Sequence, residues 1–200
     1  MKIYTMLLYI ITINLYSCKS VNVSQKKKPE MEKFDIVSFN KYKINNMANY
    51  TASDGNRILS EDIDSYYFEQ IKSNINDPFS FKYRFFKSSL ALMSSCQFFY
   101  NIPTGEYLEY DQHGKLIIKK DYDSPYLFSI NDLIQKMAKE FNTDLMTPIK
   151  GIDVARYVDD NSKLPEYSIR IPINESSFRY IVLDGNSGNV KKDVIGHNIE

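Results

Sequence analysis

Apolar residues recur at intervals of three and four between residues 129 and 142, and this is the clearest structural pattern in the chain. The stripe consists of Ile130, Leu133, Ile134, Met137, Ala138 and Phe141. This spacing places all six side chains on one side of a helix. Ser129 precedes the stripe and Asp132 lies three residues further on, an arrangement that resembles a helix-capping box. The pattern therefore predicts an amphipathic helix that ends near Asn142.

Strand-like alternation follows this helix. The apolar positions of the first strand alternate with polar or turn-forming residues and are Tyr167, Ile169, Ile171 and Ile173. Residues 178–183 and 189–195 predict two further strands, and the Asp-Gly-Asn-Ser-Gly sequence at 184–188 predicts the turn between them. We expect a loop around Pro148 and Gly151. The last third of the chain is therefore predicted to be a helix followed by an antiparallel β-meander.

Short strand-like runs separated by turn residues dominate residues 34–126. The apolar positions of the first predicted strand are Phe34, Ile36 and Phe39. Residues 53–56 read Ser-Asp-Gly-Asn, which is a strong turn signal. Residues 60–71 predict a short helix, because Ser60 is a suitable N-cap and acidic residues follow it in the first turn. Asn-Asp-Pro at 76–78 is expected to end that helix.

The remaining strands of this region are predicted at residues 80–86, 90–100, 106–110 and 115–120. Asp111 to Gly114 joins the last two as a hairpin, in which Gly114 supplies the positive φ that the turn requires. Together the patterns predict an α+β protein. Its antiparallel β-rich part covers residues 34–126, and an amphipathic helix packed on a β-meander covers residues 127–200.

Two segments of these regions resemble known families. Residues 105–116, Gly-Glu-Tyr-Leu-Glu-Tyr-Asp-Gln-His-Gly-Lys-Leu, are similar to the hairpin of bacterial MORN-like repeats, and a fainter copy runs from Lys87 to Tyr100. The helix and meander, with Tyr-Ile-Val-Leu-Asp-Gly-Asn-Ser-Gly-Asn-Val at 180–190, resemble the PepSY domain. MORN-like hairpins stack into sheets and carry no chemistry of their own. The PepSY resemblance implies inhibition or chaperoning of a secreted enzyme such as a peptidase.

The longest apolar stretch, residues 3–16, lies near the N-terminus just after Lys2. It is shorter than the roughly 20 apolar residues that a membrane-spanning helix needs, and its length is typical of a signal peptide. The stretch is followed by Ser17 and Cys18, and the sequence then becomes polar at once. This order resembles a lipoprotein signal, as found in the Bacteroidota. The resemblance implies removal of residues 1–17 and a lipid such as palmitate on Cys18; an ordinary secretory signal with an incidental cysteine is the alternative.

Residues 18–33 are polar and rich in lysine, and we expect them to form a flexible tether. The lysine run at 26–28 either rests against anionic lipid head groups or is a solvated spacer. Lysines follow the cysteine in this chain, whereas surface-exported lipoproteins of the Bacteroidota usually carry acidic residues there. A lysine directly after the cysteine, here Lys19, resembles the pattern of lipoproteins sent to the outer membrane. The expected location is therefore the bacterial cell envelope, at the outer membrane and facing the periplasm.

The amino-acid composition limits the classes of function that the chain can have. Removal of Lys2 with the signal leaves 24 basic residues against 25 acidic ones, so the chain offers no basic field for nucleic acid. If Cys18 carries a lipid, Cys96 is the single remaining thiol and no intramolecular disulfide forms. Cys96 lies in an apolar-rich segment without a nearby histidine, which favours a buried inert thiol over a nucleophile.

Catalytic and metal-binding patterns are weak. Asp121 with Asp123, Asp159 with Asp160, and Asp184 lie in turn-like sequences, and none belongs to a twelve-residue calcium loop. His113 falls in a predicted hairpin turn and His197 in a C-terminal tail that we expect to be frayed; neither has ligands at zinc spacing. We therefore predict no cofactor, no metal and no enzyme activity.

Two hypotheses for function remain, beside a purely structural role as a lipid-tethered spacer. The first is a membrane-anchored, non-catalytic module that binds an envelope or secreted protein, as an inhibitor, an immunity-like protein or a chaperone. Tyr107, Tyr110 and Tyr180 are the candidate binding residues, with half-buried sheet packing as the simpler explanation for each. The second is an envelope hydrolase with a site between the two halves of the chain.

Overall fold

The computed structural model describes residues 32–148, 150–160 and 162–197. The predicted signal peptide, Cys18 and nearly all of the predicted tether lie outside the described residues. Neither of the two helices described has the length and apolarity that crossing a membrane requires. The described chain is β-rich, with two antiparallel sheets and two helices, which agrees with the predicted α+β class.

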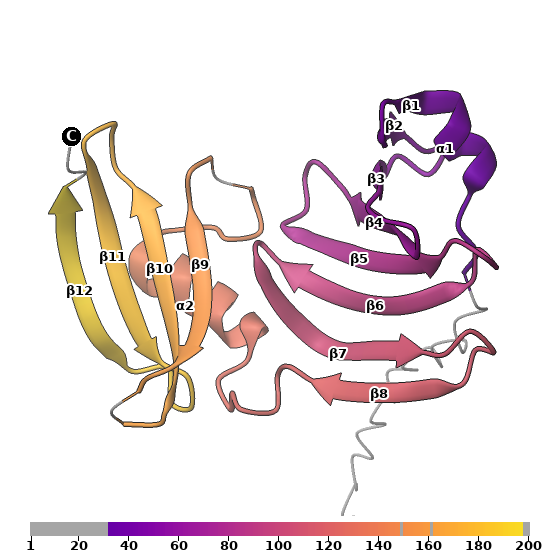
Figure 1. Ribbon diagram of the computed structural model, residues 1–200. Helices are drawn as coiled ribbons and strands as arrows, with labels where there is room; N and C mark the ends of the chain where they lie inside the picture. The colour runs from indigo at the N-terminus through magenta and orange to yellow at the C-terminus, as the bar shows by residue number, and fades with distance from the viewer. Residues whose placement is uncertain (1–31, 149, 161, 198–200) are drawn as a thin grey trace, which may run out of the picture. The chain divides into compact units, whose positions relative to one another are not determined.

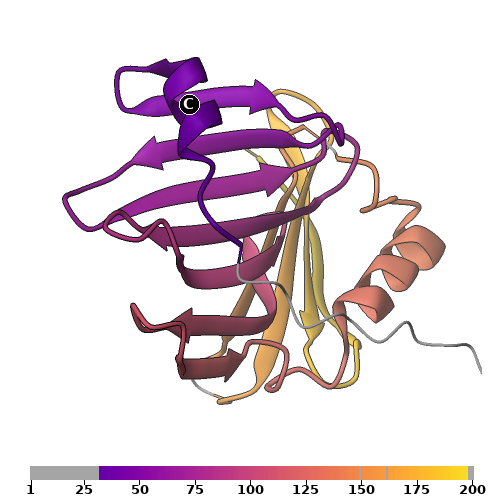
Figure 2. The same cartoon turned by 90° about the vertical axis from the view of Figure 1, so that its right-hand side faces the viewer.

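The larger sheet has eight strands that follow one another in chain order, so every strand pairs with its sequence neighbour (Figures 1 and 2). Its strands are β1 (Lys43–Ile44), β2 (Met47–Thr51), β3 (Arg57–Asp62), β4 (Tyr67–Ser73), β5 (Phe79–Phe86), β6 (Leu92–Phe99), β7 (Ile102–Tyr110) and β8 (Leu116–Asp121). All pairings are antiparallel. The short connections between the strands carry turn residues, as the sequence predicts.

The first predicted strand is wrong, because residues 36–42 form helix α1 (Ile36–Tyr42). Asp35 caps this helix, and its Oδ1 accepts the backbone N–H of Ser38 at 2.9 Å. Phe34 and Phe39 pack together on Phe68 of β4, with ring centroids 4.3–5.4 Å apart. The spacing of these aromatic residues therefore reflects a capped helix that packs on the sheet, and not the alternation of a strand.

The helix predicted over residues 60–71 is also wrong, because this segment contains the end of β3, a turn and most of β4. The Asp64 carboxylate holds the turn by accepting the backbone N–H groups of Tyr66 and Tyr67 at 2.7 and 3.1 Å. Ser60 is buried, and its hydroxyl donates across the sheet to Gln70 at 3.4 Å instead of capping a helix. The Asn-Asp-Pro sequence at 76–78 therefore lies in the turn between β4 and β5.

The other local predictions in this region are confirmed. Strands β5 and β6 cover most of the two predicted runs, and β7 and β8 form the predicted hairpin. In its turn, Gly114 has a φ of +78° and donates its N–H to the Asp111 carbonyl at 3.0 Å. The Asp111 carboxylate accepts the N–H groups of His113 and Lys115.

The smaller sheet contains four strands in the order β12-β11-β10-β9. They are β9 (Asp153–Val158), β10 (Pro165–Pro172), β11 (Ser177–Asp184) and β12 (Val190–His197), and helix α2 (Ile130–Phe141) precedes them. The predicted capping box is present, and Asn142 ends the helix in a left-handed conformation. Strand β9 is not among the predicted strands. The expected fraying of His197 is wrong, because His197 of β12 pairs with Ser177 of β11.

Two apolar cores are built on one face of the larger sheet. The first core combines Leu133 and Met137 of α2 with the inner face of the smaller sheet and with Phe99 and Ile102 of the larger sheet. The second core joins Phe34 and Phe39 to Phe68, Phe85 and their neighbours. Phe79 packs on the first core, and Phe85, six positions further along β5, belongs to the second. Since side chains alternate along a strand, the opposite face of the larger sheet carries the intervening residues of β5, among them Lys82 and Arg84.

Candidate functional site

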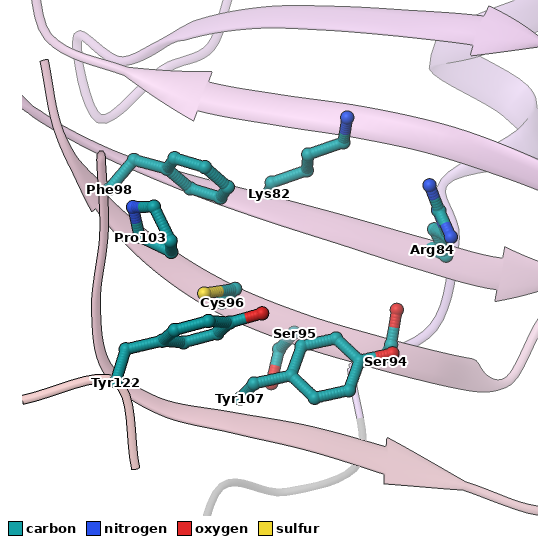
Figure 3. Close-up of a pocket in the computed structure, with 9 residues that line it drawn as sticks. All are labelled: Lys82, Arg84, Ser94, Ser95, Cys96, Phe98, Pro103, Tyr107 and Tyr122. Carbon is teal, nitrogen blue, oxygen red and sulfur yellow. The ribbon is translucent and has the colours of Figure 1, made fainter. Parts of the chain in front are cut away.

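A cavity of about 180 Å³ lies on this opposite face of the larger sheet (Figure 3). Its lining residues come from β5, β6, β7 and the segment after β8, and are Lys82, Arg84, Ser94, Ser95, Cys96, Phe98, Pro103, Tyr107 and Tyr122. Lys82 pairs directly with Cys96 across the sheet, and Arg84 pairs with Ser94. Cross-strand pairs project from the same face, so the register of β5 and β6 places both cations beside the cavity floor.

One end of the cavity is apolar. Cys96, Phe98 and Pro103 lie together there, with the ring of Tyr122 beside the thiol (Figure 3). Cys96 is buried, as the sequence predicts, and its S–H donates to the Gln97 carbonyl at 3.4 Å. Burial raises the pKa of the Cys96 thiol, which therefore stays protonated at neutral pH. Cys96 thus contributes an uncharged, apolar floor.

The rim of the cavity along β5 carries positive charge. Lys82 Nζ lies 2.7 Å from one oxygen of Glu69 on β4, and Arg84 Nε lies 3.2 Å from the other oxygen. The Arg84 guanidinium also sits over the ring of Tyr67, 5.0 Å from its centroid. Lys82 and Arg84 therefore share the Glu69 carboxylate. Counted with Lys120 over the Tyr122 ring and Glu109 beside Tyr107, three cations face two carboxylates around the cavity, which leaves a local positive surplus.

Two tyrosines form the remaining wall. Tyr107 and Tyr122 meet edge to face with ring centroids 6.5 Å apart, and Lys120 lies over the Tyr122 ring at 4.3 Å. The Tyr107 hydroxyl donates to Glu109 Oε2 at 2.7 Å. Desolvation, followed by the hydrogen bond to Glu109, raises the pKa of Tyr107, so the phenol is neutral and the wall combines ring surface with a polar edge.

The three tyrosines singled out from the sequence do not form one site. Tyr107 lines the cavity, whereas Tyr110 packs against the core that contains Phe39. Tyr180 is half-buried on β11 of the smaller sheet, where Lys192 lies 5.4 Å from its ring centroid. Sequence reasoning missed Lys82, Arg84 and Tyr122. The available signal was the regular alternation of cationic and aromatic residues along Phe81–Phe85, but it does not identify their neighbours on other strands.

A second polar cluster surrounds Arg156 of β9, whose side chain is 6 % exposed. Its Nη1 lies 2.6 Å from Asp123 Oδ1, and its Nη2 donates to the Tyr167 hydroxyl at 3.1 Å. The guanidinium also lies over the rings of Tyr126 and Tyr167, with centroid distances of 4.4 and 5.3 Å. Its Nε is buried without a hydrogen-bond partner. The cluster joins the smaller sheet to the end of the β7–β8 hairpin.

The other acidic residues considered for chemistry stabilise turns. Asp121 accepts the N–H of Asp123, and Asp123 accepts the N–H of Gly105 in addition to its contact with Arg156. Asp159 and Asp184 each accept a backbone N–H from a following serine. These turn hydrogen bonds also lower the pKa of Asp184, with the backbone N–H of Ser187 as the largest cause. Within the described ranges, no three His, Cys, Asp or Glu side chains gather at a spacing suited to a metal ion.

Comparisons of the chain with models of protein families, with curated proteins and with solved structures give no match.

Proposed function

We propose that this protein is a lipid-anchored, non-catalytic module that binds another protein of the bacterial cell envelope. The observation that carries this proposal is the cavity between Lys82, Arg84, Tyr107 and Tyr122, on the sheet face opposite both apolar cores. Tyrosine and arginine are among the residue types that dominate binding energy at protein interfaces. The inhibitor, immunity-like and chaperone-like roles are three forms of this same activity.

The two family resemblances are consistent with such a role and stay part of the proposal. The MORN-like stretch at residues 105–116 falls within the β7–β8 hairpin, which supplies Tyr107 to the cavity. The PepSY-like stretch belongs to α2 and the smaller sheet, whose core is shared with Phe99 and Ile102 of the larger sheet. In this proposal the smaller sheet supports the binding face and the hairpin contributes to it.

The binding role is tested by placing a photo-crosslinking phenylalanine analogue at Tyr107 in the cells that make the protein. We expect one crosslinked product of defined mass after irradiation, because the aromatic analogue retains the ring that borders the cavity. The matched control carries the analogue at Val37 of α1, which is 76 % exposed and lies away from the cavity. Equal products from both positions, or none from Tyr107, would contradict the proposal.

The anchor is tested separately. Labelled palmitate is expected to enter the wild-type chain and not the Cys18→Ser variant, since the cysteine sulfur is the proposed attachment point. The variant should leave the membrane fraction, because the lipid is the proposed source of its membrane affinity. Palmitate labelling of the Cys18→Ser variant, or its retention in membranes, would contradict the lipid anchor. Neither result would affect the proposed binding of a partner protein.

A further inference from the structure

The size of the cavity limits its occupant. Pockets for small molecules and cofactors span roughly 300–1,000 Å³. The cavity here has about 180 Å³ and is bordered by residues of three neighbouring strands and Tyr122. A space of this size suits one side chain of a larger partner, which is how buried anchor residues bind at protein interfaces.

The lining of the cavity defines the chemistry of that side chain. Cys96, Phe98 and Pro103 present apolar surface, and the pKa of the Cys96 thiol is raised by burial, so no charge lies at the floor. Tyr107 already donates its hydroxyl to Glu109, which leaves the ring as its main contribution to the cavity. An aliphatic or aromatic side chain satisfies this apolar floor, and a negative charge is satisfied only at the rim beside Lys82 and Arg84.

The charged rim adds a second requirement. Glu69 contacts Lys82 with one oxygen and Arg84 with the other, so both cations depend on one carboxylate. A further carboxylate from a partner would balance the surplus through charge-assisted contacts with Lys82 and Arg84. Since Lys82 is the direct cross-strand neighbour of Cys96, side chains at these positions lie only about 5 Å apart at Cβ. The carboxylate and the apolar side chain therefore belong to neighbouring positions of one partner segment.

The chain's own N-terminal segment does not have this chemistry. Residues 18–33 contain five lysines and two glutamates, so their net charge has the same sign as the rim. Like charges at a binding surface disfavour association. An acidic segment of another protein is the better electrostatic match.

We infer that the cavity receives one aliphatic or aromatic side chain of an extended acidic segment in a partner protein, and that Lys82 and Arg84 bind a carboxylate next to it. This inference rests on the proposed function and names the chemistry of the partner. Cys96 and Phe98 select the apolar side chain of the partner by its shape, and Lys82 and Arg84 select the neighbouring carboxylate by its charge.

The test is a selection from a displayed library of random ten-residue segments on the Cys18→Ser chain. We expect the enriched segments to carry an apolar residue within two positions of Asp or Glu. Binding of each fluorescent peptide is then measured by anisotropy. The double variant Lys82→Ala/Arg84→Ala should weaken binding at least tenfold, and Tyr122→Ala should weaken it about fivefold through the lost ring contact.

Lys72→Ala is the matched control for the charge change. Lys72 also belongs to an ion pair, with Asp54 at 2.9 Å, but it does not line the cavity. This variant should bind within twofold of the parent, and circular dichroism must show that every variant is folded. A second parent lacking residues 19–31 should bind the peptides equally well, since the inferred site does not involve that segment.

Enriched segments without a carboxylate, full binding by the folded double variant, or no enrichment at all would each overturn the inference. Binding that increases when residues 19–31 are removed would also overturn it, because that segment would then occupy the site. A crosslink from Tyr107 together with any of these results would leave the proposed function standing. Absence of the crosslink removes the proposed function itself.

Discussion

Arg156 shows how one buried side chain holds the junction between two sheets. Its guanidinium contacts Asp123 and Tyr167, and it lies within 3.4 Å of the carbonyl oxygens of Pro103 and Tyr122. Arginine suits this position because its flat guanidinium stacks on rings while donating in several directions. An ammonium group has the same charge but cannot reproduce that geometry.

Replacing Arg156 with lysine should therefore lower the free energy of unfolding by about 2 kcal/mol. The estimate is below the 3–5 kcal/mol typical of a fully buried pair that loses a partner, because Asp123 is 47 % exposed. Urea unfolding followed by circular dichroism measures the difference. As a control, Lys163→Ala removes an exposed pair with Asp160 at 3.9 Å and should change stability by less than about 0.5 kcal/mol. Equal stability of Arg156→Lys and the wild type would show that the contacts specific to the guanidinium do not stabilise the fold.

At the scale of elements, the turns determine which of the elements predicted from local patterns form in the fold. The turn between β11 and β12 is stabilised by Asp184, which accepts the N–H groups of Asn186 and Ser187. Gly188 completes the turn with a φ of +71° and lies against Phe128. A Cβ atom at Gly188 would come within 2.3 Å of Phe128 Cε2. This turn thus combines a backbone requirement with a packing requirement.

The pair Gly188→Ala and Gly55→Ala separates these two requirements. Gly55 has a similar φ of +82° with open space around it, so Gly55→Ala should cost only the backbone strain, about 1–2 kcal/mol. Gly188→Ala should cost at least about 1 kcal/mol more, because Phe128 must also move. Thermal or urea unfolding of both variants gives the comparison. A smaller loss at Gly188 than at Gly55 is the result that would contradict it.

The two failed element predictions have a common cause. Residues 36–42 and 60–71 contain signals for both helix and strand, and neither has a long periodic pattern. Aromatic packing on Phe68 favours a helix at the first segment, and pairing with β5 favours a strand at the second. Tertiary contacts override weak local preference in such short segments.

At the scale of the whole molecule, the larger and smaller sheets share an apolar core. Phe99 and Ile102 of the larger sheet are buried together with Leu133, Met137 and Ile169. Shared burial couples the stability of the two sheets, because neither can lose its partner without exposing apolar surface to water. The described residues from 32 onwards are therefore expected to unfold together.

Leu133→Ala tests this coupling. The leucine is fully buried in α2, so its truncation should cost about 2–5 kcal/mol. In the Cys18→Ser background Cys96 is the one thiol, and its reaction with a thiol reagent reports opening of the larger sheet. We expect the urea midpoint for Cys96 exposure to fall together with that of circular dichroism. An unchanged midpoint at Cys96 would mean that the two sheets unfold independently, and Lys163→Ala again serves as the neutral control.

The sequence by itself determined the elements whose information is local. Helix α2 follows from its apolar stripe and capping box, the β10–β12 meander from alternation and the Asp184 turn, and the β7–β8 hairpin from Gly114. Only the tertiary structure decided the identities of α1 and β4, the pairing of β9, and the neighbours of Tyr107. Strand register brings Lys82, Arg84 and Cys96 to one face, and register depends on long-range pairing that no local pattern encodes. The cavity is for that reason a property of the fold, although each of its residues is visible in the sequence.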